Sequence, residues 1–126
     1  MRSSKTILVV DDDEVVRHLI EVMLNLAGYR VITAADGEEG VKRIRRDKPD
    51  VVITDVNMPR LGGKGLCEMT DALKSERPFL TVVLTANPLE ADETWVRGMT
   101  ETQFMDKPFS PACLLEAVDR YLGETG

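Results

Sequence analysis

Five short apolar runs recur along the chain and are separated by longer segments in which polar residues dominate. The first, third and fourth runs are continuously apolar rather than alternating, a pattern typical of strands buried on both faces of a parallel sheet. Strands are therefore expected at Ile7–Val10, Val31–Thr33, Val51–Thr54, Leu80–Leu84 and the shorter Gln103–Met105.

The segments between these runs carry apolar residues at spacings of three and four, which predicts amphipathic helices. In the first segment the inner face is formed by Val16, Leu19 or Ile20, Met23 and Ala27. Gly28 follows as a C-terminal stop. The last segment opens with Ser110 as N-cap and Pro111 at the first helical position. Helices are expected around Val16–Ala27, Gly37–Arg46, Leu66–Leu73, Glu90–Arg97 and Ser110–Leu122.

Strands and helices alternate along the whole pattern, with short connections between them. Such alternation predicts right-handed crossovers and an α/β fold, in which a doubly wound parallel sheet carries helices on both faces. The pattern accounts for all of the sequence, so residues 1–126 are expected to form one domain with its core at about 5–122. We expect no output domain within this sequence.

The composition limits the possible functions. The chain has 126 residues and a formal net charge of −6, which argues against direct binding of nucleic acid, because that requires a positive surface. No apolar run approaches the ~20 residues that span a bilayer, and the apolar stretch before Asp11 is too short for a secretory signal. We therefore expect a cytoplasmic protein with no membrane contact. Its cysteines, Cys67 and Cys113, are expected to be reduced and mostly buried.

Residues that can carry chemistry follow four of the five expected strands. Asp11 and Asp12 come after the first strand, and Asp55 comes after the third. Thr85 follows the fourth strand, and Lys107 lies just beyond the fifth. Because sites in open parallel sheets form outside the carboxyl ends of the strands, these side chains are expected to converge on one edge.

Such a group of side chains suits a particular chemistry. Carboxylates within a few ångströms of each other repel, so at neutral pH they need a cation or raised pKa values. Hard oxygen ligands suit Mg²⁺, which binds one or two carboxylates together with phosphate oxygens. Asp55, shielded by the metal, can then accept a phosphoryl group covalently. Lys107 can place positive charge on the phosphoryl oxygens, and Thr85 can offer a hydroxyl donor.

Simpler roles account for other polar residues. Asp13 or Glu14 is expected to cap the first helix, so Asp13 is kept out of the site. The basic stretch Lys42–Arg46 is interpreted as the solvated face of the second helix, and His18 as a surface residue. The segment Gly62–Gly65 lacks the spacing and the Ser or Thr of a phosphate-binding loop, so it is interpreted as a flexible lead into the third helix.

Five segments, taken in their order and spacing, resemble the receiver domains of two-component response regulators, from about Lys5 to Leu122. The segments are Ile7–Asp13, Ala34–Glu39, Pro49–Pro59, Leu84–Ala86 and Lys107–Phe109. The resemblance implies a flavodoxin-like (βα)5 fold with strand order 2-1-3-4-5. One departure is Met99–Thr102 before the fifth strand, where members usually carry Gly-Ala.

The resemblance also implies roles at the metal and phosphorylation site. Asp55 would be the phosphoacceptor. Asp12 would bind Mg²⁺ directly and Asp11 would help, partly through water, while Asn57 would contribute its backbone carbonyl. The chain is accordingly expected to be a phosphoacceptor and not an enzyme, with at most slow autophosphatase activity.

A switch and its partners follow from the same resemblance. Thr85 would bond the phosphoryl group and Lys107 would pair with it, aimed by a cis peptide before Pro108. Phe104 stands where the family places its switch aromatic, and it would couple Thr85 to a face formed by the fourth helix, fifth strand and fifth helix. Trp95 in that helix is either an exposed partner anchor or buried against the sheet. A histidine kinase or phosphotransfer protein would donate the phosphate, and an effector protein or an output domain outside this sequence would respond; a homodimer formed on phosphorylation stays open.

Three alternatives remain open. Asp11-x-Asp13 after a strand also resembles the opening motif of haloacid-dehalogenase phosphatases, in which Asp11 would be the nucleophile; that family normally needs a longer chain, and Asp55 would have no role. A second alternative is a receiver that acts as an interaction module and is never phosphorylated. A nucleotide-binding flavodoxin-like protein would need glycines in the first loop, where this chain has aspartates.

Overall fold

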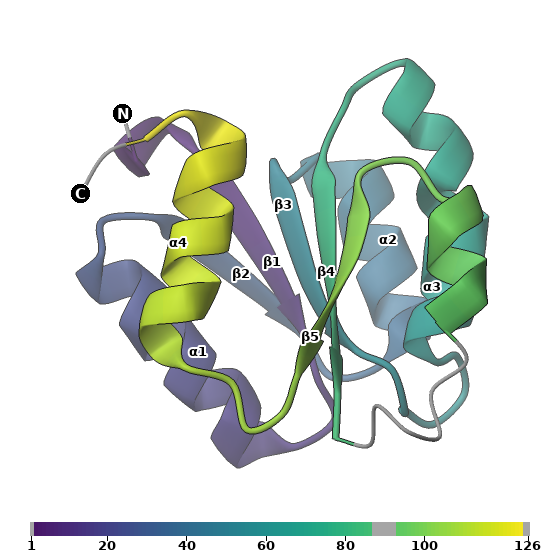
Figure 1. The fold of residues 1–126 in the computed structure, drawn as a ribbon, viewed down its shortest axis with the longest axis horizontal. Coiled ribbons are helices and arrows are strands. Elements are labelled where there is room, and N and C mark those ends of the chain that lie inside the picture. Colours follow the sequence, from purple (N-terminus) through teal and green to yellow (C-terminus); the bar gives the residue numbers. More distant parts are fainter. Residues whose placement is uncertain (1, 87–92, 125–126) are drawn as a thin grey trace.

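The protein is described by a computed structural model that covers residues 2–86 and 93–124. Its centre is a five-stranded parallel sheet in the order β2-β1-β3-β4-β5 (Figure 1), which confirms the doubly wound α/β fold and the expected strand order. The strands are β1 (Thr6–Val10), β2 (Arg30–Ala34), β3 (Val51–Asp55), β4 (Leu80–Thr85) and β5 (Thr102–Asp106).

Helices cover both faces of the sheet (Figure 1). One face carries α1 (Glu14–Leu26) and α4 (Pro111–Leu122), and the other carries α2 (Gly37–Asp47) and α3 (Gly63–Thr70). Three 3₁₀ helices complete the described chain: η1 (Arg2–Ser4), η2 (Asp71–Ser75) and η3 (Glu93–Gly98). Each face of the sheet has its own apolar core, because the central strands present buried side chains in both directions.

The local signals in the sequence explain where the longer helices begin and end. Of the two expected cap residues, Asp13 caps α1 by accepting hydrogen bonds from the backbone N–H groups of residues 15 and 16, and Glu14 is the first residue of the helix. Asp36 caps α2 in the same way, and Ser110 caps α4 ahead of Pro111. Lys48 ends α2 in the left-handed conformation at φ 49°. These caps set the direction in which each helix leaves the sheet edge.

The expected fourth helix, Glu90–Arg97, differs from the structure. Residues 90–92 lie outside the described residues, and the following segment is the 3₁₀ helix η3 rather than an α-helix. Thr94, Trp95, Val96 and Gly98 are all weaker helix formers than Ala or Leu. Short connectors with such composition commonly adopt the tighter 3₁₀ winding.

The expected third helix also changes character, because α3 ends at Thr70 and continues as η2. The Thr70 hydroxyl donates to the carbonyl of Leu66 at 2.8 Å, a bond that competes with the helix backbone. Beyond it Lys74 turns inward and is only 6% exposed. Its ammonium donates to the carbonyls of Thr100 and Glu101, so η2 is tied to the segment before β5.

The cysteines behave differently from each other. Both are free, but Cys67 is buried and Cys113 is exposed, so the expectation of buried thiols holds only for Cys67. Cys113 lies on the outer side of α4, whose inward positions are Leu114 and Val118. Burial raises the pKa of the Cys67 thiol to about 12, which keeps it protonated at neutral pH. None of the helices in the described ranges has the length and apolar character that a bilayer crossing requires.

Candidate functional site

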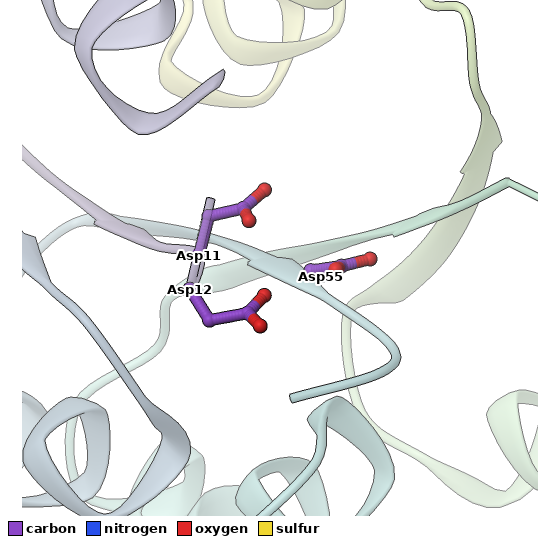
Figure 2. Close-up of side chains that lie close together, drawn as sticks. All are labelled: Asp11, Asp12 and Asp55. Atoms are coloured by element: carbon purple, nitrogen blue, oxygen red, sulfur yellow. The ribbon is translucent and has the colours of Figure 1, made fainter. Parts of the chain in front are cut away.

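Three carboxylates meet at the carboxyl ends of β1 and β3. Asp11 and Asp12 follow β1 directly, and Asp55 is the last residue of β3. The two strands pair with Val10 opposite Thr54, so the next residues, Asp11 and Asp55, lie side by side. One oxygen from each of the three carboxylates lies within 4.8 Å of the others, and Figure 2 shows the side chains reaching into the same space.

Asp11 is the buried member of this cluster, with 1% exposure. Its Oδ1 accepts the backbone N–H of Asp13 at 2.9 Å, but its buried Oδ2 has no hydrogen-bond partner among the described residues. Burial raises the pKa of the Asp11 carboxyl, although the Asp13 N–H and Lys107 oppose this shift and the neighbouring carboxylates of Asp55 and Asp12 add to it. A buried carboxylate oxygen of this kind is expected to have a cation or donor beside it.

Lys107 is the cation of the cluster. Its Nζ lies 3.5 Å from Asp11 Oδ2 and 3.4 Å from Asp55 Oδ1. Both separations exceed those of a direct hydrogen bond, so the ammonium stands between the carboxylates without closing on either. The backbone N–H of Lys107 donates to the carbonyl of Thr85 at 2.7 Å, and the Lys107–Pro108 peptide is cis, as expected.

Thr85 and Phe104 occupy the neighbouring strands. Asp55 pairs with Leu84 in β4, so Thr85, the next residue of β4, lies just past Asp55 at the carboxyl end of the sheet. Thr85 is buried, with 2% exposure. Phe104 is partly buried in β5 and meets Trp95 of η3 edge to face, with ring centroids 5.4 Å apart. Of the two expectations for Trp95, the structure favours packing against the sheet, because Trp95 is partly buried against the core on this face. Asn57 lies exposed in the loop after β3.

The donor set fits a hard divalent cation. The three ligand atoms are all carboxylate oxygens, which Mg²⁺ and Ca²⁺ prefer. Asp11 Oδ2, which faces Lys107 at 3.5 Å but has no hydrogen bond among the described residues, would gain a further counter-charge from such an ion, and the repulsion between the three carboxylates would fall. Asp11, Asp12 and Asp55 can therefore hold a metal ion, with Lys107 next to it.

The comparison with known proteins decides the family. The sequence profile of the response regulator receiver domain matches residues 7–119. The chain belongs to this family.

Relatives of known sequence or structure agree with this receiver-domain assignment. The alkaline phosphatase synthesis transcriptional regulatory protein PhoP of Bacillus subtilis is 41% identical over 108 residues, which are 86% of this chain and 44% of that protein. The chain thus spans less than half of the length of that relative.

Two solved structures have the same fold. The receiver domain of the sensor histidine kinase PA1611 of Pseudomonas aeruginosa, with a magnesium ion coordinated in its active-site cleft, has a TM-score of 0.84 and 32% identity over 95% of this chain and 98% of that one. The chemotaxis protein CheY4 of Vibrio cholerae has a TM-score of 0.83 and 30% identity over 93% of this chain and 98% of that one.

Gly63 is a site residue of this receiver domain that the sequence did not reveal. A Cβ at this position would lie 2.5 Å from the backbone oxygen of Asp55, which is closer than real side chains approach. The N–H of Gly63 donates to the carbonyl of Val56 at 3.0 Å, which holds the loop against the end of β3. Gly63 was interpreted as part of a flexible lead, but its backbone packs tightly against the backbone of Asp55 and Val56.

An apolar stripe on α1 was also missed. Four large apolar side chains are exposed at spacings of four, three and four: Val15 (68%), Leu19 (62%), Val22 (40%) and Leu26 (83%). The sequence left open whether Leu19 or Ile20 faces the core, and the structure buries Ile20. The stripe begins at Val15, three residues after Asp12, so one end of it lies near the carboxylate cluster and the rest extends along α1. Exposed apolar patches of this kind mark interaction surfaces.

Proposed function

We propose that this receiver domain is a phosphorylation switch in which Asp55 accepts a phosphoryl group. Asp11, Asp12 and Asp55, with the backbone carbonyl of Asn57, hold Mg²⁺ for this step. The observation that carries the proposal is the position of Lys107, whose Nζ lies 3.4 Å from Asp55 Oδ1. Mg²⁺, when bound, supplies positive charge to the phosphoryl oxygens. The magnesium ion in the PA1611 receiver domain supports this choice of metal.

The transfer itself uses few residues. A carboxylate oxygen of Asp55 forms a new P–O bond while the P–N bond to a histidine of the donor breaks, and the histidine nitrogen keeps the electron pair and takes a proton from solvent. Lys107 balances the charge of the phosphoryl oxygens, and the Thr85 hydroxyl donates a hydrogen bond to one of them. Because this reaction depends on positioning and charge neutralisation, no further nucleophile or general base is needed.

Phosphorylation changes the face formed by η3, β5 and α4. The phosphoryl group draws Thr85 toward Asp55, and Phe104 in the adjacent strand responds to the space that Thr85 leaves. The contact between Phe104 and Trp95 supports this route, because movement of either ring changes the packing of η3. Phe104 has no hydroxyl with which to hold an inward or outward position, so packing alone sets its equilibrium.

The donor is a histidine kinase or a phosphotransfer protein, and it docks along the exposed apolar stripe of α1. A protein that presents its histidine to Asp55 has to lie over the rim formed by Asp12, where this stripe begins. Phosphorylation then acts on an effector protein or on an output domain outside this sequence, either directly or through a dimer of receiver domains. The similarity to a transcriptional regulatory protein supports an output in transcription.

Phosphorylation by a small-molecule donor tests the proposal. Incubation with Mg²⁺ and acetyl phosphate should raise the intact mass by one phosphoryl group, and Asp55→Asn should abolish this increase. Asp13→Asn is the matched control, because asparagine also caps α1 and Asp13 does not belong to the cluster. Loss of the phosphate in Asp11→Asn together with its retention in Asp55→Asn would establish the phosphatase chemistry instead. An unchanged mass in the wild type under all conditions would establish an unphosphorylated interaction module.

A further inference from the structure

A long groove lies between α2 and the segment formed by α3 and η2, on the face of the sheet opposite α1. Its larger hollow, of about 490 Å³, lies beside the C-terminal end of α2 and has an apolar floor made by Ile44, Pro49, Leu73 and Phe79. Volumes of this size are typical of pockets that hold a ligand. We call this hollow, together with the one that adjoins it, the α2–α3 groove.

The adjoining hollow, of about 270 Å³, continues the groove toward the N-terminal end of α2. Its apolar side chains are Val41, Leu61 and Met69, and Met69 is 48% exposed. Arg45 lines both hollows, so they lie next to each other along α2. The lining residues run along α2 from Glu38 to the C-cap Lys48, so the two hollows together extend about 15 Å at 1.5 Å per helical residue. This length matches about five residues of extended polypeptide.

The basic residues in and just after α2 fall into two groups, those that line the α2–α3 groove and those that do not. Arg43 and Arg46, which line neither hollow, pair with Asp47 at 3.3 and 3.2 Å. Lys42, Arg45 and Lys48 line the groove and form no ion pair with any described residue. The helix dipole favours cations in the last turn of α2. It does not explain why the cations without an ion-pair partner are the ones that line the hollows. Lys42, Arg45 and Arg46 are exposed, as the sequence predicts for a solvated face, and the exposed cations beside the hollows are the ones without an ion-pair partner among the described residues.

Further cations complete the rim of the groove. Arg60 and Arg77 also line it, but they are neutralised by Asp36 at 2.6 Å and Asp50 at 3.6 Å. The lining residues thus include five cations and two carboxylates; with Arg60 and Arg77 paired to acidic residues outside the lining, the three unpaired cations exceed the two carboxylates by one, on a chain whose net charge is −6. An excess of positive charge over an apolar floor is complementary to a ligand that carries both carboxylates and apolar side chains.

We propose that the α2–α3 groove binds an extended acidic segment of a partner protein. Apolar side chains of that segment enter the two hollows, and its carboxylates pair with Lys42, Arg45 and Lys48. Nucleic acid and anionic membranes fit less well, because the apolar floor of the two hollows offers nothing to phosphates but can bind the apolar side chains of a polypeptide. The groove lies across the sheet from α1, so this partner can bind while a phosphodonor occupies α1 (Figure 1).

A designed peptide tests the proposal directly. The probe is a fluorescein-labelled peptide of about ten residues in which glutamates alternate with leucines, and fluorescence anisotropy measures its affinity. Binding should weaken as salt is raised, and it should be lost when the leucines are replaced by serine or the glutamates by lysine. When the peptide is added to isotope-labelled protein, the backbone amide signals that change in the NMR spectrum should belong to residues of α2, α3 and η2.

Matched variants locate the binding. The double substitution R45E/K48E should weaken the peptide at least about tenfold, and Met69→Glu should weaken it through the second hollow. R30E/R97E makes the same charge change at exposed residues outside the groove and should leave the affinity within about twofold. All variants should take up phosphate on Asp55 and melt as cooperatively as the wild type, which separates this surface from the phosphorylation site.

Two results would overturn the proposal. One is the absence of peptide binding, or binding that R30E/R97E weakens as much as R45E/K48E does. The other is groove-dependent binding of duplex DNA or of anionic lipid vesicles that is tighter than binding of the peptide, because the ligand would then be a polyanion and not an acidic protein segment.

Discussion

At the scale of single residues, Gly63 sets how closely the loop after β3 approaches the phosphoacceptor. Gly63→Ala is expected to lower the free energy of unfolding by about 1–3 kcal/mol, because a Cβ there would lie 2.5 Å from the Asp55 carbonyl oxygen and push the loop outward. The same displacement should slow phosphorylation by acetyl phosphate. Urea denaturation and intact-mass kinetics measure the two effects.

Gly98→Ala is the control for this prediction. A Cβ at Gly98 meets nothing within 4 Å, so the substitution should be neutral or stabilise the protein by up to about 1 kcal/mol. Equal losses of stability in both variants would mean that helix or turn propensity matters here rather than the close approach to Asp55.

The sequence predicts reactive side chains better than close backbone contacts. Asp11, Asp55 and Lys107 could be predicted as neighbours because each follows a strand, and the edges of a parallel sheet bring strand ends together. Gly63 could not, since its role depends on which backbone atom lies against it in space. Its signal was limited to a glycine pair after a proline-containing loop, which equally suits a flexible turn.

At the scale of elements, the N-terminus of α2 carries an acid-sensitive pair. Asp36 accepts the N–H of Glu39 at 2.9 Å and pairs with Arg60 at 2.6 Å, and these contacts hold its pKa below the ordinary 3.8. A carboxyl group whose pKa is lower in the folded than in the unfolded protein stabilises the fold. This stabilisation is complete at pH values above the unfolded-state pKa and is lost as the pH falls through the folded-state pKa. The excess stability of the wild type over Asp36→Asn should therefore persist near neutrality and shrink below about pH 4 in urea titrations.

A double-mutant cycle separates the ion pair from the cap. Asparagine still caps the helix, so the coupling between Asp36→Asn and Arg60→Gln reports the charge interaction. It should be below about 1 kcal/mol at neutral pH, because Arg60 is largely exposed, and it should vanish in acid. Coupling that persists unchanged in acid would show that the carboxylate charge is not responsible.

Elements with strong periodic patterns could be predicted, and those under tertiary control could not. The buried strands β1, β3 and β4 appear where continuous apolar runs predict them. The segment at η3 (Glu93–Gly98) differs because it is only six residues long and several of its residues are weak helix formers. On α1, apolar residues occupy two faces, and only packing against the sheet decides that Ile20 is buried and Leu19 is not.

At the scale of the whole molecule, alternation of strands and helices was sufficient for the fold class, and family resemblance supplied the strand order. Contacts between distant parts of the chain left no trace in the sequence pattern. The clearest is a cluster in which Asp119 of α4 receives hydrogen bonds from Arg2 of η1 and from the hydroxyl of Tyr29. Arg2 also donates to the carbonyl of Ala27, so the cluster joins the first described residue to the α1–β2 turn and to the last helix.

Removal of the Asp119 charge should therefore weaken the fold as a whole. Burial opposes ionisation of Asp119, but the hydrogen bonds from Arg2 and Tyr29 outweigh it and hold its pKa below the ordinary value. Asp119→Asn is expected to lower the free energy of unfolding by about 1–3 kcal/mol in urea denaturation, with a single cooperative transition. Glu116→Gln is the matched control, since Glu116 also pairs with an arginine of α4 but both partners are largely exposed, and its cost should be below about 0.5 kcal/mol. Equal costs for the two substitutions would show that the cluster is an ordinary surface pair and that the N-terminal segment does not brace α4.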